Sequence, residues 1–153
     1  MTVTERMAEL GIHLPDPAKP VGSYVPAIQA GSLVVTSGQL PMREGMLVCA
    51  GKVGLDVTLE QASAGAGIAV TNALAAAAAV VGGIERIKRV VRVCVYVNSA
   101  PGFTDQPKVA NGASDLLVKI FGDNGRHARS AVGVSELPLN AAVELDLMVQ
   151  VAV

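Results

Sequence analysis

The feature that most constrains this chain is a long stretch without a charged side chain, from Gln61 to Ile84. Its apolar part, Ile68 to Ile84, has 17 residues, the lower limit for a helix that crosses a membrane. Ala and Gly dominate this part, and Thr71 and Asn72 interrupt it, which weakens any signal for membrane insertion. We therefore expect a helix buried on most sides by close packing, and no membrane partner.

The composition predicts a core of small aliphatic residues. The chain has 23 Ala and 24 Val, but only two Tyr, two Phe and no Trp. Charged residues make up 16%, below the roughly 25% of ordinary soluble domains, so we expect apolar surface hidden in an oligomer interface. The length of 153 residues fits one domain, and the apolar content excludes global disorder.

Charge and cysteine content exclude several classes of partner. A net charge of -1 leaves no electrostatic footprint for a phosphate backbone, so no nucleic-acid partner is expected. Cys49 and Cys94 lack the spacing of a zinc motif with His13 and His127, so we expect no metal and two buried free thiols. No phosphate-binding loop, nucleophile elbow or Cys-His nucleophile arrangement occurs, so the standard covalent machinery is absent, and no cofactor is expected. The beginning of the sequence does not resemble a secretory signal, which favours the cytoplasm.

The first third predicts a short arm followed by a hairpin. Residues 1–20 form the expected N-terminal arm, with one short helix over 5–10, and residues 21–153 form a single domain. Residues 24–37 predict two short strands around an Ala-Gly-Ser turn. A further short strand is possible over 46–49.

The middle of the chain predicts a long helix and a strand. Thr58 and Gln61 form the ends of a capping-box sequence, so a helix is expected over 59–81, before Gly82-Gly83. Valines then alternate with other residues over 91–97, which is the period of a strand. Both faces of this strand are largely apolar, so it lies at or near the centre of a sheet.

The last third completes an α+β fold. Apolar residues at helical spacing predict a second helix that ends at Phe121. Two strands follow within 130–153, and in the final one odd-numbered residues from Val143 are apolar while Glu144 and Asp146 lie on the other face. We expect one mixed sheet covered by two helices on one face. The other sheet face must find a partner.

A small polar set stands out in this apolar chain. Its members are Tyr24, Ser37, Gln39, Asn111, Arg129, Ser130 and Glu144. The guanidinium of Arg129 suits two-point contact with a carboxylate ligand, although an ion pair with Glu144 or Asp146 is the alternative. Glu144 is a general base, an acceptor that orients water, or an exposed strand residue. Tyr24 and Asn111 cap loops by default, and His127 is interpreted as solvated in a polar loop.

Several motifs together resemble one family. They are Gly22-Ser23-Tyr24, Thr36-Ser37-Gly38-Gln39-Leu40-Pro41, Asn111, Ala128-Arg129-Ser130-Ala131-Val132, and Leu137-Pro138 followed by Val143-Glu144-Leu145. From about Pro20 onward, their order is similar to that of the reactive-intermediate deaminases, the RidA family, formerly YjgF. The resemblance implies a chorismate-mutase-like fold and a homotrimer with the sheets in a central barrel. It also implies ligand sites in clefts between subunits.

The resemblance also implies roles for individual residues. Arg129 corresponds to the arginine that grips the carboxylate of a 2-imino acid, Glu144 to the acidic residue near the attacking water, and Tyr24 to a tyrosine that reaches into the cleft. The remaining substrate-binding candidates are Ser37, Gly38, Asn111 and Ala131. Ala131 replaces a residue that is often Cys or Thr, and His127 stands where the family usually has Pro. The altered loop before Arg129 and the divergent N-terminal arm indicate a subgroup whose substrate differs from 2-aminoacrylate, whereas Ala131 is harmless if its position acts through the backbone.

The leading hypothesis is a cofactor-free hydrolase that converts small 2-imino or enamino acids to 2-oxo acids and ammonia. Arg129 anchors the carboxylate, and Glu144 orients or deprotonates a water. The alternative is a non-catalytic trimer that binds a carboxylate metabolite through Arg129 and has no need of Glu144. An endoribonuclease or translation inhibitor is the weakest hypothesis, because RNA binding needs a cationic path and stacking surfaces.

Overall fold

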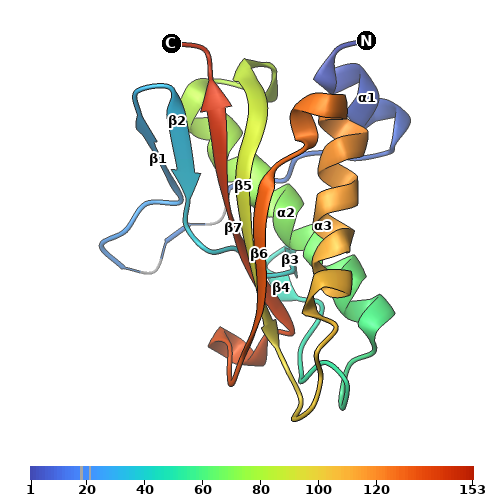
Figure 1. Ribbon diagram of the computed structural model, residues 1–153. Coiled ribbons are helices and arrows are strands. Elements are labelled where there is room, and N and C mark those ends of the chain that lie inside the picture. Colours follow the sequence, from blue (N-terminus) through green and yellow to red (C-terminus); the bar gives the residue numbers. More distant parts are fainter. Residues whose placement is uncertain (18, 21) are drawn as a thin grey trace.

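A five-stranded sheet organises the computed structural model, which describes residues 1–17, 19–20 and 22–153 (Figure 1). The strands are β1 (Ala27–Ala30), β2 (Leu33–Thr36), β5 (Ile87–Asn98), β6 (Ala128–Val134) and β7 (Val143–Val151). Their order is β1-β2-β7-β5-β6, and only the β5–β6 pair is parallel. The expected mixed sheet is confirmed, with β5 one place from the middle.

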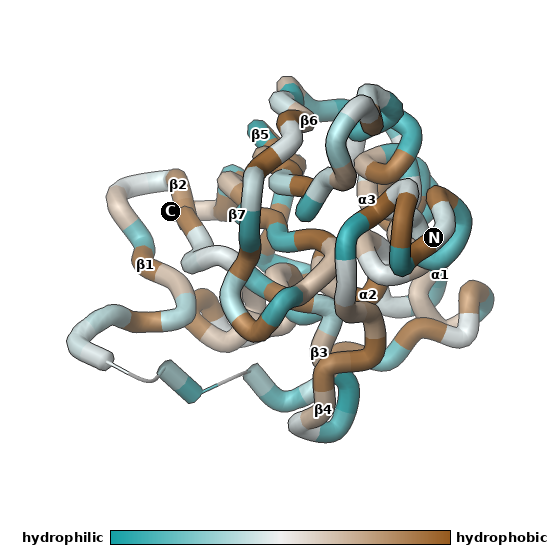
Figure 2. Tube along the Cα trace, turned by 90° about the horizontal axis from the view of Figure 1, so that it is seen from below, coloured by the Kyte–Doolittle hydropathy of each residue, from teal (hydrophilic) through white to brown (hydrophobic). Residues whose placement is uncertain are grey.

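Shorter elements connect the sheet to its helices. A second, two-stranded sheet pairs β3 (Met42–Arg43) with β4 (Met46–Leu47), where a strand was expected over 46–49. The α-helices are α1 (Val3–Glu9), α2 (Leu59–Val81) and α3 (Gln106–Phe121). The 3-10 turns are η1 (Ile84–Arg86), η2 (Gly122–Gly125) and η3 (Pro138–Asn140). Seen from below, the strands of the five-stranded sheet lie on one side and the helices on the other (Figure 2).

Helix α2 begins and ends where the sequence predicts. The Thr58 hydroxyl accepts from the Gln61 backbone N–H, and the Gln61 side chain accepts from the Thr58 N–H. Gly82 ends the helix in the left-handed conformation, with φ 89°. By length and composition α2 could cross a membrane, but 56% of its most apolar window is buried in the domain. Packing against the sheet and α3 therefore accounts for its apolar character.

The two long helices cross at a pair of glycines. A Cβ atom on Gly112 of α3 would overlap the Ser63 carbonyl group of α2, whereas one on Gly67 of α2 would make ordinary contact with the Gly112 oxygen at 3.4 Å. Gly112 is therefore required for the close approach of the two backbones. This approach lets two helices share one face of a narrow sheet.

The sheet has two distinct faces. On β7, Val143, Leu145, Leu147, Val149 and Val151 are buried beneath the helices, and we call this side the helix face. Glu144, Asp146 and Met148 point to the other side, which we call the open face. Along the open face, Ile28, Val35 and Val132 are 60%, 37% and 46% exposed. The described residues leave this face without a helical cover.

The N-terminal helix packs on the same side as the other helices. Met7 joins the core, and the Thr4 backbone N–H donates to the Glu85 carboxylate at 2.7 Å. The Arg6 guanidinium also donates to the Ile120 carbonyl at 3.4 Å. Residues 3–9 are thus fixed to the domain, while the expected boundary at residue 21 lies outside the described residues.

Candidate functional site

Arg129 lies on the edge strand β6 and points to the helix face. Its register partner on β5 is Val93, a buried core residue of that face. The Arg129 Nη1 atom donates to Asn111 Oδ1 at 2.8 Å and to Ser114 Oγ at 3.2 Å, both on α3. Within the part of the chain that the structure describes, no carboxylate forms an ion pair with Arg129. The expected alternative, an internal ion pair, is thus not formed, and the cation is held by neutral acceptors.

His127 is not the solvated loop residue that the sequence indicates. It is half-buried just before β6, with Nε2 2.9 Å from Ser114 Oγ and Nδ1 2.6 Å from the Gly125 carbonyl oxygen. The interpretation failed because the polar loop 123–127 is largely a 3-10 turn, η2, that folds back against α3. The turn places its histidine beside the residues that hold Arg129.

Glu144 lies on the open face, opposite Tyr96 in the β5–β7 register. Burial, and then the charge of nearby Asp146, raises the pKa of Glu144 above its ordinary value. Asp146 accepts a hydrogen bond from Tyr96 Oη at 3.1 Å, and burial raises its pKa also. Burial and the Asp146 charge raise the pKa of Tyr96 to about 12. This group of acids can hold a proton more readily than free carboxylates do.

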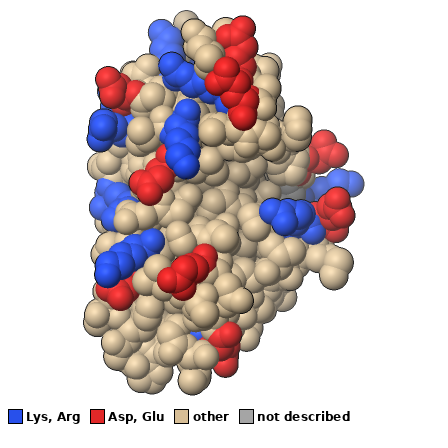
Figure 3. All heavy atoms as spheres, turned by 90° about the vertical axis from the view of Figure 1, so that its right-hand side faces the viewer, with Lys and Arg blue, Asp and Glu red and all other residues tan. Residues whose placement is uncertain are grey.

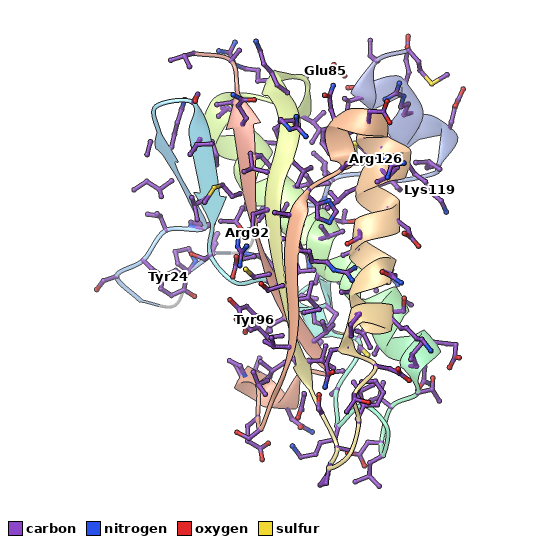
Figure 4. All side chains as sticks on the ribbon, in the orientation of Figure 1. Tyr24, Glu85, Arg92, Tyr96, Lys119 and Arg126 are labelled. Atoms are coloured by element: carbon purple, nitrogen blue, oxygen red, sulfur yellow. The ribbon has the colours of Figure 1, made fainter. Side chains whose placement is uncertain are left out.

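The segment 37–38 supports the Glu144 carboxylate. A Cβ atom on Gly38 would stand 2.9 Å from Glu144 Cδ, so the missing side chain makes room for the acid. Ser37 Oγ donates to the Val25 carbonyl at 2.6 Å, which fixes the segment leading to β1. Tyr24, in that segment, is 52% exposed and lines a shallow depression with Ser37. Tyr24, Arg92 and Tyr96 all lie to the left of β5, β6 and β7 in Figure 4.

The candidate residues therefore form two groups on opposite faces. Arg129 and Asn111 belong to the helix face, together with Ala131, which packs partly buried against the core. Glu144 and Gly38 belong to a second group, with Ser37 and Tyr24 beside them. The register alone separates the groups, because Arg129 shares a face with Val93 and Glu144 shares the other with Tyr96. One copy of the chain does not bring Arg129 and Glu144 together.

Several polar residues of these groups are not singled out by the sequence. Ser114 is one of many small residues in α3, and only the fold shows that it faces Arg129 and His127. Asp146 and Tyr96 lie on strands along which apolar residues alternate with other residues. This alternation indicates the face on which each side chain lies, but not that the two side chains are in contact. Arg92 donates from the open face to Ser130 Oγ at 3.0 Å.

No metal cluster among the described residues and no cationic patch on the face drawn in Figure 3 adds to these groups. Among the described residues, no three His, Cys, Asp or Glu side chains are placed to hold a metal ion. Cys49 and Cys94 are free and half-buried. On the side of the molecule that carries α1 and α3, basic and acidic residues are interspersed among uncharged surface (Figure 3).

Comparisons with known proteins give a consistent result. The family described as "YjgF/chorismate_mutase-like, putative endoribonuclease" matches residues 4–151. "Protein TCP17" of Trypanosoma cruzi is 42% identical over 97% of this chain and 93% of its own length. A 2-iminobutanoate/2-iminopropanoate deaminase of Dermatophagoides farinae is 31% identical over 90% of this chain and 93% of its own length. The crystal structure of a "putative endoribonuclease" of Shewanella oneidensis is 34% identical, covers 99% of this chain and 100% of that one, and superposes with a TM-score of 0.94.

Proposed function

Because the chain belongs to the YjgF/chorismate-mutase-like family, we propose that it hydrolyses small 2-imino acids to 2-oxo acids and ammonia. The observation that carries this proposal is the state of Arg129: a half-buried guanidinium held by neutral acceptors, without a carboxylate partner among the described residues. The name of the 31% identical Dermatophagoides farinae relative, an imine deaminase, supports the choice of substrate.

Arg129 supplies the binding energy for the substrate carboxylate. The contacts with Asn111 and Ser114 use Nη1 alone, so within the described part of the chain Nε and Nη2 remain for a ligand. A carboxylate that accepts from two of these donors is oriented as well as bound. The neutral partners leave the positive charge of Arg129 uncompensated, which favours an anionic substrate.

Glu144 acts on the water. In the proposed reaction it accepts a proton as the water oxygen bonds to the imine carbon, and the C=N double bond becomes a single bond. Glu144 returns this proton to the nitrogen, and the hydroxyl proton then passes through Glu144 to the nitrogen as the C–N bond breaks, so that ammonia leaves and the hydroxyl oxygen becomes the oxo group. A carboxylate whose pKa is raised by burial binds a proton more readily than an exposed one does, which favours Glu144 as the proton acceptor in this step.

Two copies of the chain are needed to build this site. Arg129 and Glu144 face opposite sides of one sheet, so we place the reaction in a cleft where the β6 edge of one copy meets the open face of the next. Apolar residues along that open face supply the contact surface. We propose a homotrimer, the assembly that the resemblance implies.

The direct test generates imino acids in situ with an amino-acid oxidase and measures oxo-acid formation above the spontaneous rate. Arg129→Lys keeps the charge but loses the planar fork, so we expect most of the activity to disappear while the melting temperature changes little. A lower melting temperature with unchanged turnover contradicts the role of Arg129 as the group that binds the substrate carboxylate. Binding of a 2-oxo acid without hydrolysis by the natural protein favours a carboxylate sensor instead.

A nuclease function is not supported by an observation on this chain. The net charge is -1, and the face in Figure 3 shows no continuous basic path for a phosphate backbone. Only two tyrosines and two phenylalanines are available for stacking on bases.

A further inference from the structure

We propose that His127 and Ser114 are positioning residues that hold the Arg129 guanidinium in its carboxylate-binding orientation. This inference rests on the proposed anchor role of Arg129 and adds two residues to it. It comes from one connected set of contacts that joins the turn η2, helix α3 and strand β6.

The direction of this series of hydrogen bonds follows from the Gly125 carbonyl group at one end of it. The Gly125 carbonyl can only accept, so the His127 Nδ1 atom 2.6 Å away must carry a proton. In a neutral imidazole the other nitrogen then has a lone pair and no proton. The Ser114 hydroxyl, 2.9 Å from Nε2, therefore donates its proton to His127.

This assignment fixes what Ser114 offers to Arg129. A hydroxyl has one proton and two lone pairs, and the proton is committed to His127. The Oγ lone pairs are left to accept from Arg129 Nη1 at 3.2 Å. All three bonds then point the same way, from Arg129 through Ser114 and His127 to Gly125, and bonds aligned in this way polarise one another.

The fold explains why the side chains of His127, Ser114 and Arg129 meet. His127 and Arg129 are two residues apart in an extended segment, so their side chains project to the same side. Ser114 reaches both from α3, one helical turn beyond Asn111, which accepts from the same Nη1 atom at 2.8 Å. Arg129 is thus held from two successive turns of one helix by uncharged groups.

Holding the guanidinium in place lowers the entropy lost when a ligand binds. An arginine side chain has several rotatable bonds, and ordering it on binding weakens affinity. Without the His127 acceptor, the Ser114 proton is no longer held away from Arg129, so the hydroxyl is less well oriented to accept from the guanidinium. A net hydrogen bond contributes on the order of 1 kcal/mol, so we expect about a three- to tenfold loss in ligand affinity.

The experiment uses five variants of the full chain: Ser114→Ala, His127→Ala, both together, His127→Gln, and Asp123→Asn as control. The control lies in the same turn, with its side chain fully exposed. Gln offers its amide oxygen near the place of Nε2, so His127→Gln can accept from Ser114. Ser114→Ala is compatible with α3, because Ala favours helix formation.

The readouts are the affinity for pyruvate by calorimetry, KM and kcat for imine hydrolysis, and hydrogen exchange of the Arg129 N–H groups by NMR. Ser114→Ala and His127→Ala should each weaken pyruvate binding about three- to tenfold, raise KM by the same factor and change kcat less than twofold. The double variant should be no worse than either single one. His127→Gln and Asp123→Asn should bind like the natural protein.

Two results overturn the inference. One is unchanged pyruvate affinity in His127→Ala with a native melting temperature, and the other is full additivity in the double variant. If the natural protein binds no oxo acid, the proposed function fails, and the NMR arm still decides the positioning role. Faster exchange at Arg129 in Ser114→Ala and His127→Ala then supports it, and unchanged exchange contradicts it.

Discussion

At the scale of single residues, Gly38 and Glu144 show how an absent side chain shapes a site. The Glu144 carboxylate occupies the space that a Cβ atom on residue 38 would take. Gly38→Ala must therefore displace the carboxylate, which is the end of a flexible side chain, while the backbone stays in place. The substitution therefore changes the position of the Glu144 carboxylate without a large change in the stability of the fold.

We predict that Gly38→Ala lowers imine turnover at least tenfold and changes the melting temperature little. A positioned proton-transfer group raises the rate by about 10²-fold or more, and displacement of the Glu144 carboxylate removes part of this effect. Steady-state rates and thermal unfolding on one preparation check this. Gly67→Ala, at a distant site with ordinary contacts, is the matched control and should keep full activity. Native turnover in Gly38→Ala contradicts the catalytic placement of Glu144.

The raised pKa of Glu144 has a consequence for stability. The folded state holds the Glu144 proton to higher pH than the unfolded state does, so this group makes folding less favourable as pH rises from its ordinary value of 4.5 through the raised one. Glu144→Gln removes this penalty. We predict that the variant is at least as stable as the natural protein at pH 7, with a difference that shrinks toward pH 4.

The same Glu144→Gln variant should lose about 10²-fold in turnover, while pyruvate affinity stays within a few-fold. Thermal unfolding across the pH range, together with both functional measurements, checks the prediction. Lower stability at pH 7 contradicts the stated cause of the pKa shift. Unchanged turnover contradicts the role of the acid.

At the scale of elements, the helix crossing depends on one glycine. Gly112→Ala places a methyl group against the Ser63 backbone, so α2 and α3 must separate. Overpacking of this kind costs about 1–3 kcal/mol, and for a domain of this size each kcal/mol lowers the melting temperature by about 2–4 °C. Gly67→Ala, at the same crossing but at ordinary contact distance, should be neutral or slightly stabilising. Equal melting temperatures for the two variants contradict this account.

Regular elements could be predicted because their signals are local. The capping box at Thr58 and the glycines after Val81 define α2 without reference to the fold. Alternation along β7 indicated which residues are buried, because a strand has only two faces. Non-local pairing could not be read in this way, so the contact of Ser114 with His127 and the small β3–β4 sheet depend on the tertiary structure.

The same limit explains how much of the site was predictable. The resemblance singled out Arg129 and Glu144 by their motifs, and Arg129 does lie beside Asn111. It did not reveal that the first two point to opposite faces, because that fact follows from the β5–β6 and β5–β7 registers together. The solvated position predicted for His127 is wrong because its loop folds back as a turn.

At the scale of the whole molecule, the open face and the divided site have one explanation in common. An uncovered sheet with exposed Ile28, Val35 and Val132 favours a partner surface, and in the proposed reaction Glu144 on that face needs an arginine from elsewhere. A second copy of the chain satisfies both needs. We predict by light scattering a mass of about three times 15.6 kDa at micromolar concentration. A stable monomer with full activity contradicts the shared site.

The most direct measurement is imine hydrolysis by mixed trimers of Arg129→Ala and Glu144→Gln chains, co-expressed with different tags and purified through both. Each variant alone is expected to keep at most about one hundredth of the natural activity. Around a ring of three, every mixed trimer has one interface at which a native Arg129 meets a native Glu144. We therefore expect about one third of the natural activity per trimer. Activity no higher than that of the separate variants, from trimers shown to contain both chains, contradicts a site built by Arg129 and Glu144 of neighbouring copies.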